Sequence, residues 1–202
     1  MHVRTLNAGE LGRLYQTELK KTFPPEERKP LSAMLRLLRE GEYIPLAYYA
    51  EDGGALLGYA LLWTEGADRP VLLDYFAVSE ALRGQGIGAE LLRELGAFLA
   101  GRALIIEAEA PDGGAEDALR QRRLDFYTRC GAEYLPYDCW LFGVTYRVLA
   151  LGGAADGQTL MEAHRSLYLR HRKRLMRKYV RIPLVPGEAL PESIPWSETE
   201  DE

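Results

Sequence analysis

A glycine-rich segment that follows a short apolar stretch has residue types suited to phosphate binding. Residues 83–88 read RGQGIG, so three glycines stand at alternate positions directly after an arginine. Glycine has no Cβ atom and lets a ligand approach the backbone closely. N–H groups at a helix start, at the positive end of the helix dipole, bind phosphate groups. Arg83 adds a cation with a forked set of donors. The segment is typical of a diphosphate-binding loop.

Two other nucleotide-binding motifs fit this segment less well. Gly84, Gly86 and Ala89 satisfy the relaxed dinucleotide pattern G-x-G-x-x-G/A, and two acidic residues follow about 20 positions later. However, five residues separate Val78 from Gly84, whereas the dinucleotide turn follows its strand almost directly. The chain also shows a single clear strand–helix–strand unit, too little for a doubly wound sheet. The absence of G-x-x-x-x-G-K-[ST] excludes a P-loop. A dinucleotide site therefore remains the weaker alternative.

The segment closely resembles motif A of the GCN5-related N-acetyltransferases, the GNAT superfamily. The signature [R/Q]-x-x-G-x-[G/A] is matched by Arg83, Gly86 and Gly88, and Val78 precedes it at the usual spacing. The resemblance implies that loop amides bind the pyrophosphate of acetyl-coenzyme A (acetyl-CoA). It also implies that backbone at the end of the preceding strand holds the pantetheine arm and polarises the thioester carbonyl. The coenzyme-binding residues implied are Phe76, Ala77, Val78, Arg83, Gly84, Gln85, Gly86, Ile87, Gly88 and Ala89.

A second segment supplies a candidate acid for the departing thiolate. Residues 126–132 read FYTRCGA and resemble motif B of the same superfamily, in which a tyrosine points at the coenzyme sulfur. The resemblance makes Tyr127 the candidate general acid. A tyrosine packed on the apolar face of a helix is the structural alternative, and the sequence leaves the two about equal.

The attacking amine must be neutral, although a free alkylamine has a pKa near 10, so a base or an anchoring carboxylate is expected. Asp74 lies four residues before Val78, where several GNAT members place an acidic residue beside the acceptor. Glu107 and Glu109 alternate along an apolar stretch and share one face of the expected strand. We expect Asp74 and Glu107 as catalytic candidates and all three carboxylates as candidate contacts for the amine. Each could instead face solvent or pair with an arginine.

The sequence departs from the superfamily pattern at several positions. Glu80 replaces a usual proline, and Ala132 replaces a usual aromatic residue. Arg120, Arg122 and Arg123 could reach the 3'-phosphate of the coenzyme, but a solvated helix face is the favoured interpretation. These departures concern the details of coenzyme contact rather than membership of the superfamily.

Apolar periodicity and turn residues predict the elements that position these groups. The expected order is strand, two helices, three strands, helix, strand, helix and two strands. This is the order of the GNAT fold, an α/β (α+β) architecture in which helices flank a mixed, mostly antiparallel central sheet. The expected strands span residues 2–6, 43–50, 55–64, 71–78, 103–110, 135–141 and 144–151.

Residues 1–151 are expected to form the acetyltransferase domain, and residues 152–202 a C-terminal extension. The extension is expected to contain a glycine-rich linker, an extra helix from Thr159 to about Tyr179, and a proline-rich acidic tail. Between His164 and Arg181 there are eight Lys or Arg residues and no acids. Such density could bind RNA or an acidic partner. Packing of the helix on the domain or on a second subunit is favoured over that interpretation.

The composition excludes several classes of protein. The 25 basic and 30 acidic residues give a formal charge of −5, which argues against a wholly nucleic-acid-binding surface. Cys130 and Cys139 give no metal or disulfide framework, so we expect no metal and a reducing compartment. No apolar run approaches about 18 residues, and the N-terminal residues lack the apolar core of a signal peptide. A cytoplasmic location without membrane attachment is therefore expected.

The sequence as a whole predicts an acetyl-CoA-dependent N-acetyltransferase that acts on a primary amine by direct attack in a ternary complex. The three strand carboxylates favour a cationic small molecule as the acceptor. The alternative is a non-catalytic acyl-CoA-binding regulatory module that acts through its basic helix. A homodimer is compatible with either prediction.

Overall fold

The computed structural model describes residues 1–170, 179–188 and 190. The chain forms two compact units, Met1–Phe98 and Leu99–Glu202. The division expected from the sequence, 1–151 and 152–202, stays a prediction. No helix within the described ranges is both long and apolar enough to cross a membrane.

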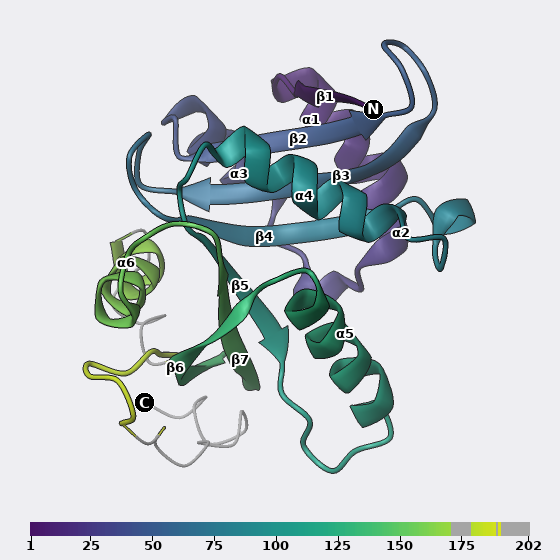
Figure 1. The fold of residues 1–202 in the computed structure, drawn as a ribbon. Coiled ribbons are helices and arrows are strands. Elements are labelled where there is room, and N and C mark those ends of the chain that lie inside the picture. The colour runs from purple at the N-terminus through teal and green to yellow at the C-terminus, as the bar shows by residue number, and fades with distance from the viewer. Residues whose placement is uncertain (171–178, 189, 191–202) are drawn as a thin grey trace. The chain divides into compact units, whose positions relative to one another are not determined.

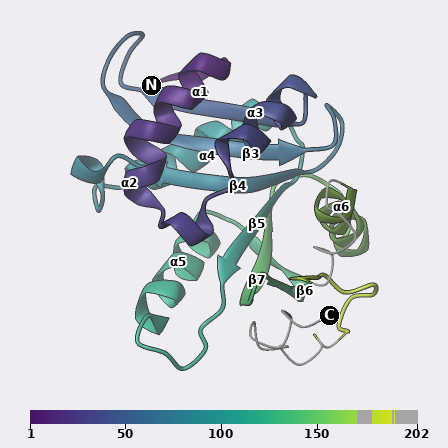
Figure 2. The same ribbon diagram turned by 180° about the vertical axis from the view of Figure 1, so that it is seen from behind.

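The first unit contains four antiparallel strands in the order β1-β2-β3-β4. Helix α4 covers one face of these strands, and α1 and α3 cover the other (Figures 1 and 2). The strands are β1 (His2–Thr5), β2 (Tyr43–Tyr49), β3 (Leu56–Thr64) and β4 (Val71–Val78), and the helices are α1 (Ala8–Leu14), α2 (Lys20–Thr22), α3 (Leu31–Arg39) and α4 (Ile87–Leu99).

The expected first helix forms, with an interruption that the periodicity did not predict. Asn7 caps α1 through a capping box, in which its side chain accepts from the Glu10 N–H and the Glu10 side chain accepts from the Asn7 N–H. The helical path continues as a π-helical turn, η1 (Tyr15–Leu19), and then as α2. The predicted stop at the prolines is confirmed, because α2 ends at Thr22.

Strand β4 contains an irregularity that singles out one residue. Leu61 of β3 pairs with Tyr75, and the next residue, Leu62, pairs with Leu73. Asp74 is therefore the extra residue of a β-bulge. A bulge re-aims a side chain and bends its strand, and bulges are frequent beside active sites.

Helix α4 packs very closely on the strands below it. Leu91, Leu92 and Leu95 are buried on its inner face. A Cβ atom at Gly58 of β3 would lie 2.4 Å from the carbonyl oxygen of Ala77 and 2.5 Å from Cδ1 of Leu91. Glycine at this position therefore permits the close approach that holds the start of α4 beside the end of β4.

The second unit contains antiparallel strands in the order β5-β7-β6-β8. Helices α5 and α6 lie on opposite sides of these strands (Figures 1 and 2). The strands are β5 (Leu104–Glu109), β6 (Glu133–Leu141), β7 (Val144–Leu151) and β8 (Val180–Arg181), and the helices are α5 (Asp117–Arg129) and α6 (Gly157–Arg170).

The C-terminal helix expected from the sequence is present as α6, whose described part ends at Arg170. Residues 171–178, which include much of the predicted basic segment, lie outside the described residues, as does the acidic tail. Strand β8 was not predicted, because two residues give no periodic signal. The predicted fold class, with mostly antiparallel strands flanked by helices, is confirmed.

Candidate active site

The glycine-rich loop lies between the end of β4 and the start of α4, with the short 3-10 turn η3 (Glu80–Leu82) inside the connection. Gly84 and Gly86 have φ values of +78° and +83°, in the left-handed region that favours glycine. A Cβ atom added at either residue would meet no atom within 4 Å, so both face open space. The loop therefore presents exposed backbone beside a helix N-terminus, as phosphate binding requires.

Several hydrogen bonds hold this loop to the strands. The Ser79 hydroxyl donates to the Leu56 carbonyl at 2.6 Å, and the Ser79 N–H donates to the Leu57 carbonyl at 2.9 Å. The exposed Arg83 guanidinium donates from Nε to the carbonyl of Val78 at 3.4 Å. These contacts place a cation at the edge of the loop, next to the last residue of β4.

The bulged residue Asp74 lies in a polar site of the first unit and is bound on both oxygens. Lys29 Nζ donates to Oδ1 at 2.9 Å and to Oδ2 at 2.8 Å, and the Tyr43 hydroxyl donates to Oδ2 at 2.5 Å. The side chains of Lys29 and Asp74 are only 16% and 12% exposed. Sequence reasoning missed Lys29, because an isolated lysine after a proline-rich turn gives no signal of its own.

Aromatic rings complete the surroundings of the Lys29 ammonium. Its Nζ atom lies 4.1 Å from the ring centroid of Trp63 and 5.5 Å from that of Tyr43. The Tyr75 hydroxyl accepts from the Lys29 N–H at 2.6 Å and donates to the Glu27 carbonyl at 2.8 Å. The predicted amine-contacting residue Asp74 thus already holds an ammonium group of its own chain, between a carboxylate and two aromatic faces.

The candidate acid Tyr127 lies on α5 and is 7% exposed. Burial raises the pKa of its phenol to about 12, although the nearby Arg123 cation acts in the opposite direction. The ring of Phe126 packs edge-on against it, with the ring centroids 5.2 Å apart. The hydroxyl therefore carries its proton throughout the neutral pH range. Its role as the general acid stays a prediction.

Glu109 of β5 forms ion pairs with two arginines of α5. Arg120 Nε lies 3.1 Å from Glu109 Oε2, and Arg123 lies 3.7 Å from Oε1. Arg120 also pairs with Asp112 and Asp117 and is only 17% exposed. For Arg120, the solvated helix face that the sequence favoured is wrong, because three carboxylates surround its guanidinium.

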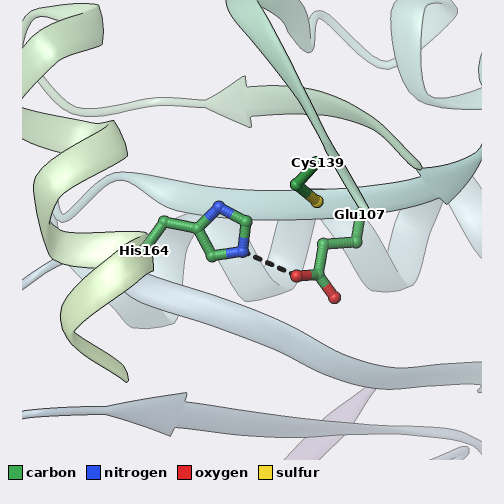
Figure 3. Close-up of side chains that lie close together, drawn as sticks. All are labelled: Glu107, Cys139 and His164. Carbon is green, nitrogen blue, oxygen red and sulfur yellow. Dashed lines mark hydrogen bonds and ion pairs between the residues drawn. The ribbon is translucent and has the colours of Figure 1, made fainter. Parts of the chain in front are cut away.

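Glu107 of β5 is hydrogen-bonded by two side chains of α6. His164 Nε2 lies 2.6 Å from Glu107 Oε1, and the Tyr168 hydroxyl donates to Oε2 at 3.0 Å. The other ring nitrogen of His164, Nδ1, lies 3.0 Å from the Tyr137 hydroxyl. Figure 3 shows the His164 ring reaching from α6 to the Glu107 carboxylate, with the Cys139 thiol beside them. Sequence reasoning missed His164, although its i, i+4 spacing to Tyr168 on one helix face was a usable signal.

The two units hold different parts of the predicted site. The phosphate loop and Asp74 both belong to the first unit, where β4 supports them. Tyr127, Glu107 and Glu109 belong to the second unit, on α5 and β5. The roles predicted for these residues stay predictions.

The sequence matches the family model described as the acetyltransferase (GNAT) domain over residues 45–131. It is also 32% identical over 112 residues to a Bacillus subtilis (strain 168) protein described as an acetyltransferase, YjbC. This match covers 55% of the chain, and the chain spans about half of that relative, at 53%.

Solved structures show the same fold. A Bacteroides thetaiotaomicron protein described as an acetyltransferase of the GNAT family matches with a TM-score of 0.66 and 22% identity, over 85% of this chain and 98% of its own. An aminoglycoside 6'-N-acetyltransferase complexed with coenzyme A matches with a TM-score of 0.56 and 17% identity, over 75% of this chain and 97% of its own. The matched domain, the related sequence and the shared fold together support membership of the GNAT superfamily of acetyltransferases.

Proposed function

We propose that this protein is an N-acetyltransferase, which moves the acetyl group of acetyl-CoA to a primary amine by direct attack in a ternary complex. The observation that supports this most is the exposed loop at Gly84 and Gly86, whose positive φ values open a space beside the N-terminus of α4. The similarity to the GNAT superfamily supports a specific ligand for this loop, the diphosphate of the coenzyme.

In this proposal, backbone amides of residues 83–89 and the Arg83 guanidinium hold the diphosphate. The backbone of Phe76, Ala77 and Val78 holds the pantetheine arm and polarises the thioester carbonyl. Hydrogen bonds to charged groups contribute about 1.5–3 kcal/mol each, so a few of them are enough for micromolar affinity.

We assign the amine to the site around Asp74 and expect a cationic small molecule. Contacts from the described residues use three of the roughly four lone-pair positions of this carboxylate, two at Oδ2 and one at Oδ1. One position at Oδ1 therefore suits an additional N–H donor. The position of the Lys29 ammonium among Asp74, Trp63 and Tyr43 supports this assignment, because these groups suit an alkylammonium.

Starting from the alkylammonium, the chemistry needs two protons removed from the nitrogen, one before the attack and one after it, and one proton supplied to the thiolate. Asp74 is our first candidate for the proton acceptor, acting through water, and Glu107 is the second. The neutral amine then attacks the thioester carbonyl carbon, the new C–N bond forms, and the nitrogen loses its second proton to the solvent. The tetrahedral intermediate collapses as the C–S bond breaks. Tyr127, which is protonated at neutral pH because burial raises its pKa, gives a proton to the departing sulfur and regains one from the solvent.

The test is release of free thiol from acetyl-CoA in the presence of single primary amines, including diamines, amino sugars and amino acids. We expect turnover with at least one cationic amine, together with stoichiometric coenzyme binding by calorimetry. Tight coenzyme binding without turnover on any amine would instead support the non-catalytic binding module. No measurable heat with acetyl-CoA would overturn both assignments.

A cytoplasmic location, favoured by the cysteine usage, and a homodimer, which the sequence left open, remain part of the proposal. Gel filtration with light scattering measures the second of these directly.

A further inference from the structure

Three different metal-ligating side chains meet in the second unit, apart from the phosphate loop. The ligand atoms of Glu107, Cys139 and His164 all lie within 4.8 Å of one another. Cys139 and His164 are both 0% exposed, and the Glu107 side chain is 13% exposed. The buried thiol therefore lies beside one histidine nitrogen and one carboxylate oxygen, and all three atoms can bind a metal.

Sheet register explains why two of these donors share a face. Glu107 of β5 pairs with Val148 of β7, and Cys139 of β6 pairs with Tyr146 of β7. Val148 and Tyr146 are two residues apart, so their side chains lie on the same face, together with those of their partners. Helix α6 brings His164 to Glu107 on that face, as Figure 3 shows.

The outer hydrogen bonds also suit metal binding. Tyr137 Oη lies 3.0 Å from His164 Nδ1, which leaves Nε2 directed at the cluster. The Tyr168 hydroxyl donates to Glu107 Oε2, which leaves Oε1 directed at it. Metal-ligating histidines and carboxylates are usually oriented by such partners on their second nitrogen or oxygen.

We propose that Glu107 Oε1, Cys139 Sγ and His164 Nε2 form a binding site for a divalent transition metal, with Zn²⁺ the best match. A thiolate, a carboxylate and a neutral imidazole carry two negative charges, so a divalent ion gives a neutral buried cluster. This mixture of sulfur, nitrogen and oxygen donors is typical of zinc, and three protein ligands leave the fourth tetrahedral position to water.

Metal binding requires one small rearrangement. His164 Nε2 and Glu107 Oε1 share a direct hydrogen bond of 2.6 Å, whereas zinc ligands at about 2.0–2.2 Å in tetrahedral geometry lie roughly 3.4 Å apart. A rotation of the Glu107 side chain supplies that separation. The proton shared by His164 Nε2 and Glu107 Oε1 moves to Nδ1 of the neutral imidazole, which then donates to the Tyr137 hydroxyl. The Cys139 thiol releases its proton to the solvent as the sulfur–metal bond forms. Glu107 would then be a ligand rather than a base, which leaves Asp74 as the proton acceptor.

The experiment uses the full chain after removal of bound metal with a chelator, followed by titration with Co²⁺ and with Zn²⁺. We expect one ion per chain, a near-ultraviolet thiolate-to-cobalt absorption band, and a higher melting temperature with Zn²⁺. Cys139→Ser should abolish the band and weaken binding at least tenfold, because loss of an outer-shell partner alone typically costs about 10–100-fold. Cys130→Ser, at the half-buried cysteine that follows α5 as its C-cap, is the matched control and should leave both unchanged.

X-ray absorption on the Zn²⁺-loaded wild-type chain tests the site without any substitution. One sulfur neighbour at about 2.3 Å, with nitrogen and oxygen neighbours, is the expected shell. A shell without sulfur, a cobalt spectrum without the thiolate band, or equal binding by Cys139→Ser would overturn the proposal. None of these outcomes depends on acetyl transfer, so the site and the enzyme assignment fail separately.

Discussion

Lys29 and Asp74 form an ion pair in which the ammonium contacts both carboxylate oxygens, with Nζ 2.9 Å from Oδ1 and 2.8 Å from Oδ2. The lysine comes from the turn before α3, and the aspartate is the bulged residue of β4. This relationship joins the segment before α3 to the strand whose end supports the phosphate loop. The carboxylate predicted to contact the acceptor amine thus holds a lysine ammonium of its own chain.

Replacing Asp74 should weaken amine binding without affecting the coenzyme. For Asp74→Asn we expect KM for a cationic amine to rise about 10- to 100-fold, because a hydrogen bond to a charged group contributes about 1.5–3 kcal/mol. Steady-state kinetics measures this, with calorimetry on acetyl-CoA as the check on the coenzyme site. Asp68→Asn, at an exposed carboxylate of the same unit, should leave both quantities unchanged. An unaltered KM in Asp74→Asn would remove this residue from the acceptor site.

The same ion pair should also stabilise the first unit. Lys29→Gln or Asp74→Asn should each lower the free energy of unfolding by about 3 kcal/mol, because each leaves a mostly buried charge without its partner. The double variant should lose less than the sum of the single losses, which urea unfolding in a double-mutant cycle measures. Strictly additive losses would show that the two groups do not interact in solution.

A methyl group in the phosphate loop should reduce coenzyme affinity. Gly86→Ala forces a Cβ atom onto a residue with φ of +83°, at a cost of about 1–2 kcal/mol, and fills space that the diphosphate needs. We expect at least a tenfold rise in the Kd for acetyl-CoA by calorimetry. Gly96→Ala, at an exposed position inside α4, is the control and should stabilise the helix by about 0.5–1 kcal/mol with unchanged affinity. Equal affinities in the two variants would argue against the loop as the phosphate site.

Removal of the Tyr127 hydroxyl should slow turnover while coenzyme affinity is kept. For Tyr127→Phe we expect kcat to fall about 10²- to 10⁴-fold, the usual contribution of a positioned acid. Single-turnover measurements separate this effect from product release. An unchanged kcat would show that Tyr127 is not the general acid and only packs on the apolar face of its helix.

The buried phenol should also make the protein sensitive to alkali. Its pKa is raised from 10.0 to about 12, so between these values the folded chain keeps a proton that the unfolded chain has lost. Stability is therefore fully present below pH 10 and falls as the pH rises to about 12, by roughly 1.4 kcal/mol per pH unit. Urea unfolding at pH 8 and pH 11 measures the slope, which should be smaller in Tyr127→Phe.

His164 should be needed to attach α6 to its sheet. His164→Ala removes a fully buried ring bonded to Glu107 and Tyr137 and leaves a largely buried carboxylate without this partner. We expect the free energy of unfolding to fall by about 3–5 kcal/mol in chelator-treated protein. Glu162→Ala, on the exposed side of the same helix, should change it by about 0.5 kcal/mol or less. Similar stability in the two variants would contradict the buried contact.

Local patterns predicted much of the fold. The spacing of apolar residues in Ile87–Leu99 and the alternation around Leu104–Glu109 reflect periods of 3.6 and 2, which the backbone itself imposes. The superfamily motif at Arg83, Gly86 and Gly88 identified the loop that the structure places between β4 and α4. Strand β8 and the π-helical turn η1 escaped prediction, because each is set by contacts with neighbouring elements.

The sequence by itself determined the order of the main helices and strands, the glycine-rich loop and the resemblance to the superfamily, because each of these depends on residues close together in the chain. The tertiary structure alone decided what each carboxylate contacts: Asp74 holds Lys29, Glu109 holds Arg120, and Glu107 holds His164. These partners are separated by 45, 11 and 57 positions. Side-chain charge alone cannot select among 25 cationic residues and three histidines, since only the folded register sets which of them comes within hydrogen-bond distance.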